Sequence, residues 1–549
     1  MIDKKIVRTN KEIFIKAINF QKKGNISEAS KIYQSLIKIG FINPFLYFNY
    51  GLILFNGGKL VQAEKCFLKT IEIKPDFLNA YFYIINILLK LQKFSKAEIF
   101  ARKTIVLNPN SFESHANLGG ILKELGKLKE AEISTRKAIN LKNDFAPAHY
   151  NLGIILSKLG KLEESEISFL KAIEINPDFY SAQYSLGIVL TNLGKLKEAE
   201  ISFLKAIEIN PDYAKAYFSL SSLNYSDDNN WKKYLFSKNI LKNQSRRDLV
   251  DIYFARANIC HKEKNYEESS KFLISANELK LKIQPSNREM LYKKSKKLLL
   301  ECKNKKINRK SSAKSPECIF IVGMPRSGST LIENILSMNP KVTPLGEVNI
   351  LEESFKNYKK DIEGLPLNEI YLKKISGLGD INMITTNKNL GNYKYAGIIA
   401  NEMPNAKIIH CFRNPLDNIL SMFRANFKSG INYSSSIVDC ALIYNNQEEI
   451  MDNYKMEFRS KIYDLNYDLL VENPTKEVES LINWLGWKWN KSYLSPHLSE
   501  RSVLTASSVE VRSPINSRSK KGWKNYKKML NPAIKIITKN KKYKKLLDE

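Results

Sequence analysis

Apolar residues recur at helical spacing through the first half of the chain. In the stretches 149–160 and 199–211 they stand at positions i, i+3, i+4 and i+7, the spacing of an amphipathic helix that buries one face. Glycine and proline interrupt this pattern in three ladders, each with a step of 34 residues. The pattern therefore predicts an array of helix pairs rather than one long helix. The ladders stand at Gly24, Gly58, Gln92, Gly126, Gly160 and Gly194; at Pro75, Pro109, Asn143, Pro177 and Pro211; and at Gly51, Ile85, Gly119, Gly153 and Gly187.

Each ladder has a mechanical reason. Glycines of the first ladder suit a left-handed turn between two helices, and prolines of the second suit the start of the next unit. Glycines of the third ladder let the partner helix approach closely. A heptad coiled coil, the alternative helical array, would lack this punctuation. The pattern resembles the tetratricopeptide repeat, whose period is 34 residues, with five clear units over about 45–223, a degenerate one before them and a degenerate pair around 249–282. The resemblance implies a solenoid over residues 1–285 whose concave groove binds a peptide or protein partner.

Residues 286–316 are rich in lysine and end in a Ser/Lys/Pro stretch. Such a run could contact phosphates. No aromatic residues alternate with its charges, however, as a surface that stacks bases requires. We therefore expect a basic, solvated linker ahead of a second domain at 317–549.

The second domain opens with an apolar strand at 318–322, a loop between Gly323 and Gly328, and an amphipathic helix. This arrangement points backbone N–H groups and a helix N-terminus at an oxyanion. Nucleoside triphosphatases and P-loop kinases carry lysine after the second glycine, whereas this chain has Ser329 there, and Arg326 enters the loop. The loop therefore favours a ligand with a shorter, less charged 5′ group, such as a phosphosulfate.

The loop sequence GMPRSGSTL at 323–331 resembles that of sulfotransferases that use 3′-phosphoadenosine-5′-phosphosulfate (PAPS), and it is closer to the tyrosylprotein sulfotransferase branch than to the cytosolic one. The resemblance covers roughly 318–530. It implies an α/β P-loop-type domain with a central, mostly parallel sheet that moves a sulfuryl group from PAPS to a hydroxyl acceptor, without a metal. Protein tyrosine, glycan, lipid and metabolite all stay open as acceptors. Homodimers are frequent in the family, so a homodimer is an open expectation.

The resemblance also assigns catalytic roles. Glu347, after Gly346, stands where the tyrosyl branch has the general base that removes the acceptor's proton. Lys388 would stabilise the bridging oxygen as the S–O bond breaks, although the proline that usually follows is absent. Arg326 and Ser507 would stabilise charge on the sulfuryl group. Glu352 and Glu353 compete with Glu347 for the role of base, but their expected helical position suits surface charges better.

Donor-binding residues follow from the same comparison. Arg413 ends a predicted strand and Ser421 follows eight residues later, the spacing of a clamp for a 3′-phosphate dianion. Arg424 is a weaker candidate because its spacing differs by one residue. Lys520 or Lys521 would reach the same phosphate, although Gly522 occupies the position of the family's basic residue. The complete set expected to bind the donor comprises Pro325, Arg326, Ser327, Gly328, Ser329, Thr330, Arg413, Ser421, Arg424, Tyr467 (near the adenosine), Ser508, Lys520 and Lys521.

Composition narrows the picture further. With 43% hydrophobic residues, wholesale disorder is excluded, and 87 Lys+Arg against 56 Asp+Glu leave a net charge of +31, which favours anionic partners. Nucleic-acid binding rests on this charge alone, and we expect none. The six cysteines form no CxxC pair, and neither a signal sequence nor a run of ~18 apolar residues is present. We therefore expect a cytoplasmic protein without a transmembrane segment. The alternative to an enzyme is a repeat scaffold with a decayed nucleotide-binding domain.

Overall fold

The computed structural model of the chain describes residues 2–223, 230–303, 317–360, 364–377, 384–427, 430–499 and 510–547, with side chains from residue 9 onward. The chain divides into two compact units, Met1–Val189 and Leu190–Glu549. No described helix has the length and apolar character needed to cross a membrane.

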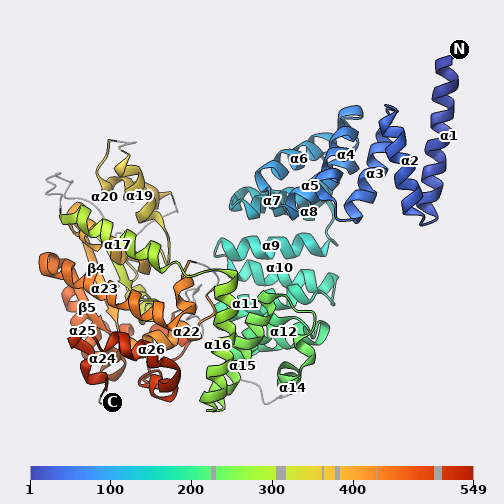
Figure 1. The fold of residues 1–549 in the computed structure, drawn as a ribbon. Coiled ribbons are helices and arrows are strands. Elements are labelled where there is room, and N and C mark those ends of the chain that lie inside the picture. The colour runs from blue at the N-terminus through green and yellow to red at the C-terminus, as the bar shows by residue number, and fades with distance from the viewer. Residues whose placement is uncertain are drawn as a thin grey trace. The chain divides into compact units, whose positions relative to one another are not determined.

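The first unit is a succession of antiparallel helix pairs (Figure 1). The predicted glycine turns are confirmed, because Gly58 and Gly160 adopt φ of +74° and +80°, and Gln92, at the position without glycine, adopts +56°. Close approach between paired helices is confirmed as well, since a Cβ on Gly153 would lie 2.7 Å from the Phe169 ring. The helices are α1 (Ile2–Lys22), α2 (Ile26–Lys38), α3 (Pro44–Asn56), α4 (Leu60–Ile73), α5 (Leu78–Lys90), α6 (Phe94–Leu107), α7 (Phe112–Glu124), α8 (Leu128–Leu141), α9 (Ala146–Lys158), α10 (Leu162–Ile175) and α11 (Tyr180–Leu193), the last of which runs into the second unit.

The second unit begins with further helices of the array. They are α12 (Leu196–Ile209), α13 (Ala214–Ser222), α14 (Asn230–Phe236), α15 (Arg246–Lys262) and α16 (Tyr266–Ile283), followed by α17 (Arg288–Lys303). The pair α15 and α16, coloured green in Figure 1, corresponds to the degenerate repeat at 249–282. Ser245 is the N-cap of α15, because its side chain accepts a hydrogen bond from the backbone N–H of Asp248.

A five-stranded parallel sheet follows, in the order β2-β3-β1-β4-β5. This confirms the predicted fold class, a helical solenoid and then an α/β domain with a parallel sheet. The strands are β1 (Glu317–Gly323), β2 (Val342–Pro344), β3 (Ile384–Asn387), β4 (Ala406–Phe412) and β5 (Ile462–Asn466). The helices between and after them are α18 (Ser329–Ser337), α19 (Ile350–Lys359), α20 (Leu367–Ser376), α21 (Ala396–Glu402), α22 (Pro415–Arg424), α23 (Ile437–Phe458), α24 (Tyr467–Glu472), α25 (Pro474–Leu485) and α26 (Lys527–Ile537).

The central strand β1 is buried on both faces, which explains its continuous apolar sequence. Phe320 and Val322 join one core, with side chains of α17 and α19 to α21, whereas Ile319 and Ile321 join another, with side chains of α18 and α25. The α17 helix therefore packs against the sheet domain, although it lies in the segment expected to be a linker. The domain boundaries themselves stay a prediction.

A third core joins α15 and α16 to the sheet domain. Phe254 and Leu273 of these two helices belong to the same buried cluster as Ile419 of α22 and Trp523 and Leu530 near α26. Hydrogen bonds cross the same contact, since the Asn277 amide donates to the carbonyl of Phe423 over 2.9 Å. The degenerate repeat pair and α22 therefore form one packed body.

Candidate functional site

The carboxyl ends of parallel strands meet at one edge of a sheet, where α/β proteins usually bind ligands. At this edge the loop between β1 and α18 makes a close approach to its neighbours. Gly323 has φ +150° and a Cβ there would lie 2.2 Å from the Cys411 carbonyl oxygen, and Gly328 has φ +89° and a Cβ there would lie 2.2 Å from the Tyr467 ring. Only glycine fits at both positions. The loop therefore places its backbone directly against β4 and the residue that follows β5.

The α22 helix holds the loop from the side. The Asn418 amide donates to the carbonyl oxygen of Pro325 over 2.9 Å, and Arg326 Nε donates to Ser421 Oγ over 3.0 Å. Ser327 is fully buried, and its hydroxyl has no hydrogen-bond partner among the residues that the structure describes. Ser329 and Thr330, also buried, open α18. The predicted loop residues are thus together, and one of them keeps an unused polar group.

The two predicted catalytic side chains after β2 and β3 form an ion pair. Lys388 Nζ lies 2.6 Å from Glu347 Oε1, and the lysine side chain is 1% exposed whereas the glutamate is 56% exposed. The backbone supports this pair, because the N–H of Lys388 donates to the carbonyl of Gly346 over 2.8 Å. A buried cation therefore stands beside a carboxylate that solvent, or an acceptor, can reach.

The competing carboxylates are engaged elsewhere. Glu352 pairs with Lys294 at 2.7 Å and with Lys356 at 2.9 Å. Although burial opposes it, these two hydrogen-bonded lysines lower the pKa of Glu352 to about 2. Glu353 is more than half exposed and lies 3.6 Å from Lys374. The Glu353 side chain is a surface charge, whereas the Glu352 side chain is only 20% exposed and lies between two lysines. Which carboxylate acts as the base stays a prediction.

Arg413 directly follows the last residue of β4 and is almost fully buried. Its guanidinium lies 4.9 Å from the centre of the Tyr467 ring, and one terminal nitrogen donates to the carbonyl of Ser519 over 2.8 Å. Its Nε has no hydrogen-bond partner in the described part of the chain, and Asp468 Oδ1 lies 4.0 Å away. The structure thus brings Arg413 and Tyr467 together and leaves a guanidinium N–H for a ligand.

Three predicted donor-binding residues make contacts within the protein, two through their side chains and Lys521 through its backbone. Arg424 lies 3.0 Å from His261 of α15, and Lys520 pairs with Glu472. Lys521 is exposed, and its backbone N–H donates to Asp417 over 2.7 Å. Ser507 and Ser508 lie outside the described residues.

Sequence reasoning missed two buried carboxylates at this edge. Glu333 of α18 is 2% exposed and accepts hydrogen bonds from the N–H of Gly346 and the hydroxyl of Thr386. Asp417 of α22 is 4% exposed and accepts from the N–H groups of Lys521 and Trp523. In sequence each looks like an ordinary helical acid, so no signal distinguished them. Asn418 was missed for the same reason.

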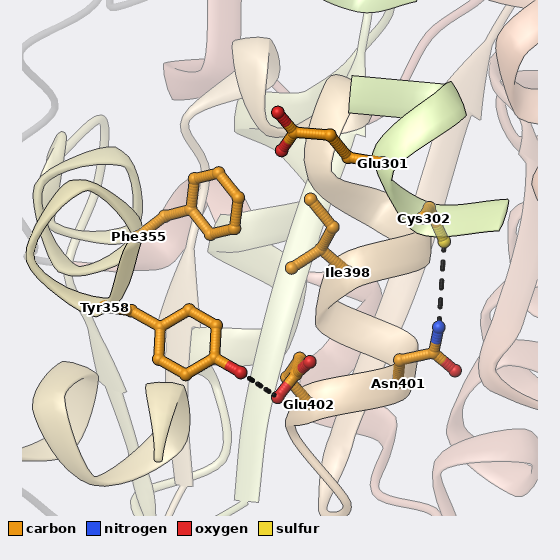
Figure 2. A pocket seen from close by; sticks show the side chains of 7 residues that line it. All are labelled: Glu301, Cys302, Phe355, Tyr358, Ile398, Asn401 and Glu402. Carbon is orange, nitrogen blue, oxygen red and sulfur yellow. Dashed lines mark hydrogen bonds between the residues drawn. The ribbon is translucent and has the colours of Figure 1, made fainter. Parts of the chain in front are cut away.

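A small pocket lies among side chains of α17, α19 and α21 (Figure 2). The Tyr358 hydroxyl bonds Glu402 across it. No predicted site residue lines it. Its lining consists of Glu301, Cys302, Phe355, Tyr358, Ile398, Asn401 and Glu402.

Comparisons with known families agree with both halves of the molecule. A model described as the sulfotransferase family matches residues 316–366 and 366–491, and tetratricopeptide-repeat models match 46–77, 112–145, 146–179 and 168–201. The chain is a tetratricopeptide-repeat protein with a sulfotransferase-family domain. This confirms the resemblance on which the site predictions rest.

Several individual proteins are similar to this tetratricopeptide-repeat sulfotransferase-family chain. An uncharacterised protein of Aquifex aeolicus is 30% identical over 322 residues, covering 54% of this chain and 42% of its own length. Protein-tyrosine sulfotransferase 2 of Gallus gallus is 22% identical over 237 residues (38% of this chain, 64% of its own), and protein-tyrosine sulfotransferase 1 of Danio rerio is 24% identical over 230 residues (37% and 65%). The chain thus spans between about two fifths and two thirds of the length of these relatives.

Two solved structures similar to the chain are tetratricopeptide-repeat proteins. A tetratricopeptide-repeat protein from Parabacteroides merdae is 16% identical, covering 50% of this chain and 93% of its own, with a TM-score of 0.36. YrrB, whose structure is described as a tetratricopeptide protein with an unusual peptide-binding site, is 22% identical, covering 34% and 95%, with a TM-score of 0.29. Among the described residues, no group of three or more His, Cys, Asp or Glu could hold a metal ion.

Proposed function

We propose that the chain moves a sulfuryl group from PAPS to a hydroxyl acceptor, and that a protein tyrosine is the acceptor. The observation that carries this is the meeting, at one sheet edge, of the glycine-bounded loop, the Glu347–Lys388 ion pair and the buried Arg413. The tyrosine acceptor is supported by the names of the two vertebrate relatives. The repeats would recruit the peptide or protein partner.

The residues at this edge suit such a donor. Ser327 Oγ and Arg413 Nε are buried polar atoms without a hydrogen-bond partner in the ranges that the structure describes, and buried polar groups are normally paired. Loop N–H groups with Ser327, Ser329 and Thr330 would hold the 5′-phosphosulfate. Arg413 and Ser421 would hold the 3′-phosphate, and the Tyr467 ring would contact the adenosine. When bound, the donor supplies an activated sulfuryl group whose leaving group is adenosine 3′,5′-bisphosphate.

The protein's own groups then have separate tasks. Glu347 Oε1 would accept the proton of the acceptor hydroxyl, a role its exposure permits. Lys388 Nζ, buried beside Glu347, would stabilise the oxygen on which negative charge develops. Arg326 would stabilise charge at the same place, and Ser507 stays a candidate for this role. No residue is needed to bind a metal in this scheme, because fixed N–H donors and cations carry the charge.

Two other functions make different predictions. A P-loop kinase would need a cation at position 329, where the chain has a buried serine. A repeat scaffold with a decayed domain would not bind adenosine 3′,5′-bisphosphate. We propose no nucleic-acid partner, and the cytoplasmic setting and the homodimer stay predictions from the sequence.

Binding and transfer can be tested in sequence. We expect adenosine 3′,5′-bisphosphate to raise the melting temperature. At a ligand concentration of 100 times its dissociation constant, binding adds about 2.7 kcal/mol to the free energy of unfolding. An unchanged melting temperature in the presence of this ligand would favour the alternative, a repeat scaffold without catalytic activity. Incubation of the protein with labelled PAPS and a total lysate, followed by identification of the labelled product, then tests the acceptor. A label found anywhere other than on a protein tyrosine would contradict the proposed acceptor. No label transfer at all would contradict the proposed enzymatic activity.

A further inference from the structure

The last described segment, residues 510–547, contacts the buried Arg413. The carbonyl of Ser519 accepts a hydrogen bond from Arg413 over 2.8 Å, and Ser519 Oγ lies 3.3 Å from the Tyr467 hydroxyl. Two residues later the chain turns in a left-handed conformation at Lys521, with φ +58°. Trp523 then enters the core and is fully buried. Residues 519–523 therefore form one wall beside Arg413.

Asp417 holds this wall to α22. Its Oδ2 accepts from the backbone N–H of Lys521 over 2.7 Å, and its Oδ1 accepts from the N–H of Trp523 over 2.9 Å. Burial raises the pKa of the Asp417 carboxyl, while the two N–H bonds and nearby Arg413 act in the opposite direction. Both carboxylate oxygens are thus committed to backbone of the wall. An acid that merely capped its own helix would not bond another segment 104 and 106 residues away.

The wall decides which way Arg413 points. Two acceptors compete for the guanidinium within the protein, the Ser519 carbonyl at 2.8 Å and Asp468, whose Oδ1 is 4.0 Å from Nε. A charged carboxylate attracts an arginine more strongly than a neutral carbonyl does. Without the carbonyl in place, Arg413 would therefore close the remaining distance to Asp468. Its Nε–H, which has no partner within the described ranges, would then bond Asp468 and would no longer be available to a ligand.

We propose that Asp417 is a positioning residue for recognition of the nucleotide's 3′-phosphate: by holding residues 519–523 against Arg413, it keeps the guanidinium oriented for that phosphate. This role rests on the proposed function, because it takes the donor to be a 3′-phosphorylated adenosine nucleotide. Asp417 itself does not touch the nucleotide. It acts through the wall and Arg413.

The test compares two ligands that differ only in the 3′-phosphate. In the full-length protein with Asp417→Asn, one backbone N–H of the wall would face an amide NH₂ instead of a carboxylate oxygen. We expect the dissociation constant for adenosine 3′,5′-bisphosphate to rise ~10-fold to 100-fold, the effect of losing a hydrogen bond to a charged group. The dissociation constant for adenosine 5′-phosphate should stay within about twofold. Asp439→Asn is the matched control, because Asp439 is also the third residue of its helix but does not contact the wall.

Each outcome of the comparison decides something. Equal weakening of both ligands, or weakening of neither, overturns the positioning role while the proposed function stands. A wild-type protein that binds the two ligands equally overturns the proposed function, and the role of Asp417 with it. Should Asp417→Asn fail to fold, amide hydrogen exchange of the wild type replaces it. Adenosine 3′,5′-bisphosphate must then protect the amides of Lys521 and Trp523 more than adenosine 5′-phosphate does, and equal protection overturns the role.

Discussion

Glu347 is the residue whose proposed role is easiest to separate from binding. Its carboxylate pairs with Lys388 but is more than half exposed, and within the described residues it forms no hydrogen bond or ion pair with the loop between Gly323 and Gly328. We expect Glu347→Gln to lower turnover with PAPS by ~10²-fold to 10⁴-fold, because the amide cannot accept a proton. Binding of adenosine 3′,5′-bisphosphate, measured by calorimetry, should be retained. Near-normal turnover would remove Glu347 from the mechanism, and lost binding would show that it supports the donor site instead.

Glu333 bonds the backbone N–H of Gly346, next to Glu347, and its substitution should affect stability rather than turnover. Its Oε1 accepts from the N–H of Gly346 over 3.1 Å and from Thr386 Oγ1 over 3.2 Å. We expect Glu333→Leu to lower the free energy of unfolding by ~2–4 kcal/mol, because a buried and a partly buried donor lose their acceptor. Glu333→Gln keeps an acceptor oxygen and should cost about 1 kcal/mol or less.

Tryptophan fluorescence during urea unfolding measures this effect selectively. All five tryptophans of the chain lie beyond residue 190 and therefore report on the second unit. Equal stability of Glu333→Leu and Glu333→Gln would show that the hydrogen bonds to Gly346 and Thr386 do not hold the turn.

The site shows what a sequence can and cannot reveal at this scale. The glycines at 323 and 328 and the arginine at 413 follow from local pattern, because a strand end, a tight loop and a buried cation each leave a signal within a few residues. Arg424, by contrast, was ranked low as a donor ligand from local spacing alone, and that role stays a prediction. Its partner His261 is 163 residues away, and that contact depends on packing that the local sequence does not record. Asp417 and Glu333 escaped notice because their partners are backbone N–H groups of distant segments.

At the scale of helix pairs, the 34-residue pattern predicted the array closely. It worked because each repeated glycine meets a near neighbour, as Gly153 of α9 meets Phe169 of α10. The ion pairs between successive pairs repeat as well. Arg136 reaches Glu132 at 2.9 Å and Glu164 of the next pair at 2.8 Å, but it is nearly half exposed. Packing rather than charge should therefore hold neighbouring pairs together.

Two substitutions test that ranking. Gly153→Ala places a methyl group 2.7 Å from the Phe169 ring and should destabilise the first unit by ~1–3 kcal/mol. Arg136→Met should change stability by less than ~1 kcal/mol, because exposed ion pairs contribute little. Thermal unfolding followed by circular dichroism measures both. A larger effect of Arg136→Met, especially one that disappears at high salt, would reverse the ranking.

At the scale of the whole molecule, repeat pattern and packing divide the chain differently. The helical periodicity continues to about residue 282, whereas the compact units separate between Val189 and Leu190. The reason is that periodicity reports how each helix meets its sequence neighbour. It does not report that Phe254 and Leu273 of the degenerate pair share a core with Trp523.

The shared core makes a specific prediction about truncation. A fragment of residues 317–549 would expose the apolar surface of α22 and α26 that α15 and α16 cover, and it would lose the Asn277 bond to α22. We expect this fragment to aggregate or to bind adenosine 3′,5′-bisphosphate at least ~10-fold more weakly, because α22 carries the contacts to Pro325 and Arg326. A fragment of residues 190–549 keeps the whole unit and should bind as the full chain does. Calorimetry on both fragments decides, since full affinity in 317–549 would show that the degenerate repeat pair has no part in forming the site.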